Sequence, residues 1–156
     1  MKRLAIVLIG LSPILVGLVQ SYLRTNVTFF SSDISYQLVG FLVFAIWFIV
    51  GRYYNKLAGS KANTVLLINT PAFLVLVLLL IQEAVLGDIW TNIVGQLTQL
   101  FYTPMLFWLV GVPAEVIREV MTASSMLSYM IIRYITSFIC LLLASYVGCV
   151  FGDRRG

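Results

Sequence analysis

The chain has 156 residues, of which 61% are hydrophobic and 10% are charged, and its net charge is +4. Soluble domains are about 45–50% apolar and about 25% charged, and one of this size cannot hide so much apolar surface from water. The sequence has no histidine, which removes the commonest general base and metal ligand, and no basic stripe interleaved with aromatic residues that would indicate nucleic-acid binding. The composition therefore predicts a single membrane domain covering residues 1–156.

Four apolar runs have about the length needed to cross the roughly 30 Å hydrocarbon layer as helices. They cover approximately residues 4–23, 34–51, 64–86 and 126–151. Lys2 and Arg3 before the first run resemble the start of a signal peptide, but the run continues past Pro13 and no A-x-A-like cleavage site follows it. We therefore predict an uncleaved first helix and an all-α bundle of four transmembrane helices.

The segment 87–125 is ambiguous. Its first half repeats apolar residues at helical spacing, as in a helix that lies in the membrane interface. Residues 105–112 are apolar but lie between Pro104 and Pro113, so they form either a short re-entrant piece or, with residues 96–104 added, a fifth crossing. Charge counting leaves both topologies open, because seven of the ten basic residues face the cytoplasm in either one.

An internal repeat favours four crossings. The stretch Leu8–Pro13 resembles Leu67–Pro71, and each opens an apolar stretch that ends with a glutamine, Gln20 or Gln82. The second and fourth runs also end alike, with a glycine followed within three residues by arginine. We therefore predict two hairpins of the same orientation in the plasma membrane, with both termini in the cytoplasm and segment 87–125 on the outer side.

Charged residues inside apolar runs are the clearest candidates for a site, because charge is costly in lipid. Glu83 in the third run and Arg133 in the last would lie at similar depth in the outer leaflet, and we predict that they pair, with Gln82, Gln20 and Tyr129 close by. An ion pair that fixes helix register is the simpler interpretation, and a substrate or lipid-headgroup site is the alternative. A third is that each side chain reaches the interface unpaired.

Two further patterns concern helix packing. Pro13 and Pro71 lie inside their runs and predict kinks, which either shape the bundle or form a hinge or substrate niche. Ala144, Gly148 and Gly152 recur every four residues, and small residues at this spacing predict close helix contact, either within the bundle or between two copies of the chain.

These features predict a non-enzymatic accessory or scaffold subunit of a membrane complex, with no cofactor and no metal. Its expected partners are membrane lipids, other membrane subunits or a second copy, and not nucleic acid. The second hypothesis is a small transporter or channel, alone or as an oligomer, with a polar site in the outer leaflet. A lipid-acting enzyme ranks third, because histidine and clustered carboxylates are missing from the sequence.

Overall fold

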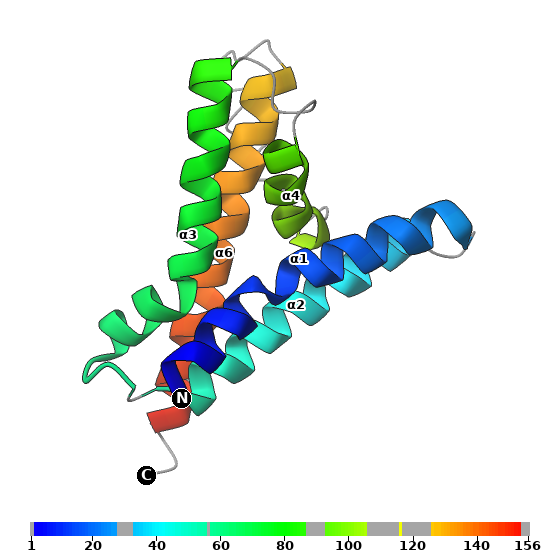
Figure 1. The fold of residues 1–156 in the computed structure, drawn as a ribbon. Helices are drawn as coiled ribbons and strands as arrows, with labels where there is room; N and C mark the ends of the chain where they lie inside the picture. Colours follow the sequence, from blue (N-terminus) through cyan, green and yellow to red (C-terminus); the bar gives the residue numbers. More distant parts are fainter. Residues whose placement is uncertain are drawn as a thin grey trace.

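The computed structural model describes residues 2–27, 33–55, 57–86, 93–105, 116 and 126–153, and within these ranges nearly every residue is helical and none is in a strand. The helices are α1 (Lys2–Asn26), α2 (Asp33–Tyr53), α3 (Lys61–Leu86), α4 (Ile93–Tyr102) and α6 (Met126–Asp153), with a short 3-10 helix, η2 (Thr103–Met105), directly after α4. Each of the four predicted apolar runs lies inside one of the four long helices (Figure 1).

Three of the described helical stretches are long and apolar enough to cross a membrane, namely Leu8–Asn26, Lys61–Gln82 and Met130–Gly152. The apolar part of α2, Gln37–Tyr53, is shorter than these three. An all-helical chain with three candidate spans is therefore confirmed, whereas a count of four crossings is not. Residues 106–112, which a fifth crossing requires, lie outside the described residues.

The order of packing differs from two simple hairpins. Helix α6 packs on α2 and on α3, whereas α1 packs on α4 and on α3. Although α1 and α2 overlap in Figure 1, they make little direct contact, so the first predicted hairpin is not confirmed as a packed pair. The reason is that η2 contacts both of these helices and α4 packs on α1, so α4 and η2 occupy the place where α2 was expected.

Glycine residues allow α2 and α6 to approach closely. A Cβ atom at Gly148 would overlap the carbonyl oxygen of Phe48, and one at Gly152 would lie 2.5 Å from that of Arg52. Because residues 48 and 52 meet residues 148 and 152 in the same order, the two helices run parallel at this contact. Two of the three small residues predicted to mediate packing thus face α2 within the same chain, and the third, Ala144, is half-buried beside the core.

A buried polar network joins α2, α3 and α6. The indole N–H of Trp47 donates to the side-chain oxygen of Asn69 at 2.9 Å. The Asn69 amide donates to the hydroxyl of Ser145 at 2.8 Å and to the carbonyl of Val65 at 2.9 Å. The Ser145 hydroxyl donates in turn to the carbonyl of Leu141. Because each of the three side chains is buried and hydrogen-bonded, the network fixes the register of the three helices without leaving an unpaired polar group.

Both internal prolines are buried, Pro13 in α1 and Pro71 in α3. The two helices cross at the second, where a Cβ atom on Gly10 would lie 2.6 Å from Pro71 Cγ. Because proline has no amide hydrogen, the carbonyl of Leu67, four residues before Pro71, lacks its usual helical donor. The hydroxyl of Thr70 does not replace this donor, because it donates to the carbonyl of Leu66 at 2.9 Å. Pro71 therefore shapes a helix crossing, and a hinge or substrate niche at the kinks stays a prediction.

The two ends of the molecule differ in charge. The start of α1, the end of α2, the start of α3 and the end of α6 lie together (Figure 1). We call this the basic end, because it includes Arg52, Lys61 and the first two residues of α1, Lys2 and Arg3, and the flanking sequence adds Lys56, Arg154 and Arg155. The other half of α3 and the first half of α6 project away from it, with α4 beside them (Figure 1).

Candidate functional site

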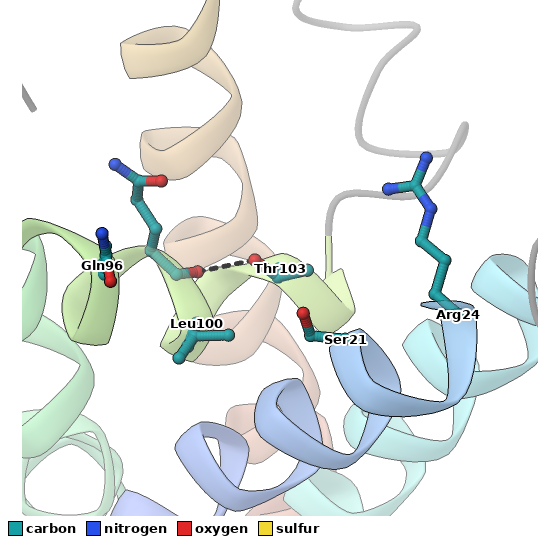
Figure 2. Close-up of a pocket in the computed structure, with 6 residues that line it drawn as sticks. Ser21, Arg24, Gln96, Leu100 and Thr103 are labelled. Atoms are coloured by element: carbon teal, nitrogen blue, oxygen red, sulfur yellow. Dashed lines mark hydrogen bonds between the residues drawn. The ribbon is translucent and has the colours of Figure 1, made fainter. Parts of the chain in front are cut away.

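A cavity of about 340 Å³ lies between the C-terminal half of α1 and α4 with η2 (Figure 2). It is lined by Ser21 and Arg24 from α1 and by Gln96, Gln99, Leu100 and Thr103 from the facing segment. Five of these six residues are polar, in a chain of which 61% is hydrophobic. We call this space the α1–α4 cavity, and its polar lining makes it the candidate site.

The local sequence explains how the cavity forms. Residues 96, 99 and 103 share one face of α4 and η2, and residues 21 and 24 share one face of α1, because positions three or four apart lie above one another on a helix. Gly17, one turn before Ser21, lets the helices approach, since a Cβ atom there would overlap the carbonyl oxygen of Leu100. The hydroxyl of Thr103 donates to the carbonyl of Gln99 at 2.8 Å and ties η2 to α4 (Figure 2). Two polar faces therefore meet across a gap.

The C-terminal end of α4 is held beside the middle of α3 by Tyr102. The hydroxyl of Tyr102 donates to the carbonyl of Ala72 at 2.7 Å, and the Tyr102 ring packs on Tyr134 of α6 with 5.6 Å between ring centroids. The Tyr102 side chain is fully buried, so this hydrogen bond is shielded from solvent. Because Thr103 follows directly, the α1–α4 cavity extends to the level of the midpoint of α3.

One buried carboxamide belongs to the residue next to Ser21 in the sequence. Gln20 belongs to the same turn of α1 as Ser21 and is 3% exposed. Its Nε2 and Oε1 atoms are both buried, and neither has a hydrogen-bond partner within the described part of the chain. Leaving a buried polar group unpaired costs about 1–3 kcal/mol. Such a group in a native protein usually has a water, an ion or a ligand as its partner.

Gln82 has the same property in another place. It is 7% exposed, and among the described residues neither side-chain polar atom has a partner. Gln82 lies ten residues beyond Ala72, which is about 15 Å along α3 at 1.5 Å per residue. The turn that carries Gln20 instead meets Thr103 near the level of Ala72. The two glutamines predicted to lie together are thus both buried but belong to different parts of the molecule.

Of the other predicted site residues, Arg133 lies nearer than Gln20 to the level of Gln82 along α3. Phe73 of α3 packs on Phe138 of α6 with 5.9 Å between ring centroids, and the two helices are antiparallel. Counting from this contact, Arg133 lies about one helical turn from the level of Gln82. The Arg133 side chain is half-buried and takes part in an interaction within the protein.

The remaining members of the predicted site are Glu83 and Tyr129. Both belong to described helices, but their side chains lie outside the described residues. The Glu83–Arg133 pair therefore stays a prediction.

Sequence reasoning missed the α1–α4 cavity. Gln20 was recognised because it ends an apolar stretch, but Ser21 and Arg24 looked like the polar edge of a span. The glutamines of α4 looked like the solvated side of an interfacial helix. A signal was present in the matching three-residue spacing of the polar residues on both segments, but only the packing of α1 on α4 brings these faces together.

The chemistry of the lining favours binding over catalysis. Hydroxyl and carboxamide groups donate and accept hydrogen bonds, and Arg24 adds a positive charge. Among the described residues, the lining holds no carboxylate, thiol or second titratable group that would act as a base beside Ser21 or Thr103. No protein-family model, curated protein or solved structure matches this chain.

Proposed function

We propose that the chain is a multi-pass protein of the plasma membrane, crossed by α1, α2, α3 and α6, with both termini in the cytoplasm. Three described stretches already have the length and hydropathy of spans, and the 21 residues of α2 extend about 32 Å, enough for a fourth. Orientation follows from the basic end, because loops rich in lysine and arginine remain in the cytoplasm. The α1–α4 cavity would then open away from the cytoplasm.

Within this membrane frame we propose a non-enzymatic role in binding or passing a small polar solute or a lipid headgroup, the role of a small transporter. The observation that carries it is the polar cavity that reaches the level of the midpoint of α3. Polar groups surrounded by lipid are expensive and mark solute paths. Short helices that end partway across the bilayer form such sites in known transporter folds. The buried carboxamide of Gln20, next to Ser21 in the sequence, is a further polar group without a hydrogen-bond partner among the described residues.

The accessory or scaffold subunit is our second proposal, and one observation favours it. The outward face of α1 exposes apolar side chains at alternating three- and four-residue spacing, which is the spacing of a helix–helix seam. These residues are Leu8, Leu11, Leu15, Leu18 and Tyr22. The small-residue pattern of α6 no longer supports this role, because Gly148 and Gly152 are already in contact with α2. A lipid-acting enzyme remains third.

Thiol labelling in intact cells tests the cavity and the topology together. In a background where Cys140 is alanine and Cys149 is serine, which keeps a donor for the Gly51 carbonyl, a new cysteine is placed at Ser21. We expect Ser21→Cys to react with a membrane-impermeant maleimide. The matched control is Val19→Cys, which is on the outward face of α1, is 57% exposed and should remain unlabelled in lipid.

Each other outcome contradicts a definite part of the proposal. Labelling of Ser21→Cys only after permeabilisation would reverse the orientation, and no labelling at all would refute a water-filled cavity. Equal labelling at Val19→Cys would place α1 in water and contradict the membrane frame. Native mass spectrometry of the protein from its own membrane separates the two functions, because a stoichiometric second protein favours the subunit and a retained small molecule favours solute handling.

A further inference from the structure

A second cavity, of about 490 Å³, lies at the basic end between α2 and α6, and it is lined by Ile49, Arg52, Tyr53 and Gly152. We propose that it binds the phosphate of an anionic phospholipid in the leaflet that adjoins the basic end. This inference rests on the proposed membrane location and is independent of the α1–α4 cavity. We call this second space the Arg52 cavity.

The helix contact described above forms one wall of the Arg52 cavity. Gly152 lies against the backbone of α2, and a Cβ atom there would be 2.8 Å from the Asn55 side-chain nitrogen and 2.5 Å from the Arg52 carbonyl oxygen. The absence of a side chain at Gly152 lets α6 lie directly against α2 beside Arg52. Phe48, one turn before Arg52 in α2, packs on Phe151, which directly precedes Gly152 in α6, with 6.0 Å between ring centroids. The pocket is therefore built by rigid helix packing.

Arg52 is a half-buried cation in this pocket. Within the described part of the chain, its guanidinium has neither an acidic partner nor a hydrogen bond. A partly buried charge at a membrane boundary is stabilised by an anion, and a guanidinium matches the paired oxygens of a phosphate. The chemistry of the pocket thus calls for a phosphate-type partner.

The remaining lining favours a lipid over free phosphate. Ile49 and Tyr53 are four residues apart on one face of α2, and they are 60% and 79% exposed. An isoleucine below a tyrosine offers an apolar surface for an acyl chain and a phenol at headgroup level. Basic sequence beside a membrane attracts anionic lipid. Lys61 begins α3 at this end, and the sequence around the ends of α2 and α6 contains Lys56, Arg154 and Arg155 against one acidic residue, Asp153.

Native mass spectrometry of the purified full-length protein tests this proposal, by titration in detergent with phosphatidylglycerol, phosphatidylcholine or inorganic phosphate. We expect phosphatidylglycerol to bind at least tenfold more tightly than phosphatidylcholine. Arg52→Gln should weaken phosphatidylglycerol binding about tenfold, and Arg52→Lys should retain part of it. The matched control is Lys61→Gln, which removes a charge from the same end but not from the lining of the pocket, and its binding should stay within twofold of the wild type.

Several results would overturn the site. Equal losses in Arg52→Gln and Lys61→Gln would show diffuse attraction to a basic surface. Displacement of the lipid by inorganic phosphate would make a soluble anion the ligand. Weakening by Arg24→Gln in place of Arg52→Gln would move the headgroup to the α1–α4 cavity. Thiol labelling of Ser21→Cys is unaffected by these outcomes, so failure of the lipid site is distinguishable from failure of the proposed solute site.

Discussion

Replacing Gly148 by alanine tests whether close contact of α2 and α6 limits stability. In an exposed helix this change is favourable by about 0.5–1 kcal/mol, because glycine loses more backbone freedom on folding. Here the new Cβ atom would overlap the Phe48 carbonyl oxygen and lie 3.0 Å from the Arg52 backbone nitrogen. The helices would have to separate by on the order of 1 Å, and overpacking of this kind costs about 1–3 kcal/mol. We therefore expect a net loss of roughly 0.5–2 kcal/mol.

Reversible unfolding of the purified protein in mixed detergent micelles measures this difference. Ala45→Leu is the control, because it adds more volume to α2 on an exposed position and should change the free energy of unfolding by less than about 0.5 kcal/mol. If Gly148→Ala proves as stable as the wild type or more stable, the glycine contact is not a tight one and the reasoning fails.

Three other substitutions probe the polar groups. Asn69→Leu leaves the buried indole N–H of Trp47 without its acceptor and should lower the free energy of unfolding by about 1–3 kcal/mol in the same assay. The control Thr70→Val removes an exposed hydroxyl and should be nearly neutral. Equal effects of the two substitutions would argue against the network. Tyr102→Phe removes one hydrogen bond to α3, so we expect a loss of about 0.5–1.5 kcal/mol and faster hydrogen exchange in α4, and unchanged exchange would contradict this anchoring role. Gln20→Leu removes an unpaired buried carboxamide and should raise stability by about 1 kcal/mol, whereas a clear loss would reveal an internal partner for Gln20.

The long helices could be predicted because each apolar run is bounded by polar links. Their ends could not, since helical hydrogen bonding continues into polar flanks, as at Asn26 and Tyr53. The packing order of α1 and α2 also escaped prediction. It depends on where α4 inserts, and that position is set by the bond between Tyr102 and Ala72, which lie thirty residues apart in the sequence.

The candidate site could be predicted only in part. The repeat singled out Gln20 and Gln82, and both are buried. Their grouping depended on the crossing angle of α1, which hydrophobic periodicity does not encode. Because α1 crosses α3 at Pro71 and then packs on α4, Ser21, the neighbour of Gln20, lines the α1–α4 cavity, and Gln20 does not lie at the level of Gln82.

The buried polar groups of the molecule differ in whether they have a hydrogen-bond partner, and among the described residues unpaired atoms occur on α1 at Gln20, on α3 at Gln82 and on α6 at the Nε atom of Arg133. The network of Trp47, Asn69 and Ser145 is fully paired and lies where α2, α3 and α6 meet. The unpaired carboxamide of Gln20 belongs to α1, whose described aliphatic side chains Ile9, Ile14 and Val16 are partly buried against the hydrophobic core, and whose Gly10 and Gly17 contact neighbouring helices. Proteins tolerate unpaired buried groups chiefly where function requires them.

The paired network and the buried core identify α2, α3 and α6 as the rigid frame, and the partly buried packing of α1 makes it the element most responsive to a ligand. This difference predicts that amide hydrogen exchange is faster in α1 than in α2, although the two helices have similar lengths. A bound solute that pairs with the lining of the α1–α4 cavity should slow exchange in α1 and leave α2 unchanged. Equal protection of α1 and α2 without ligand would show that α1 belongs to the frame, and the cavity would then lack a movable wall.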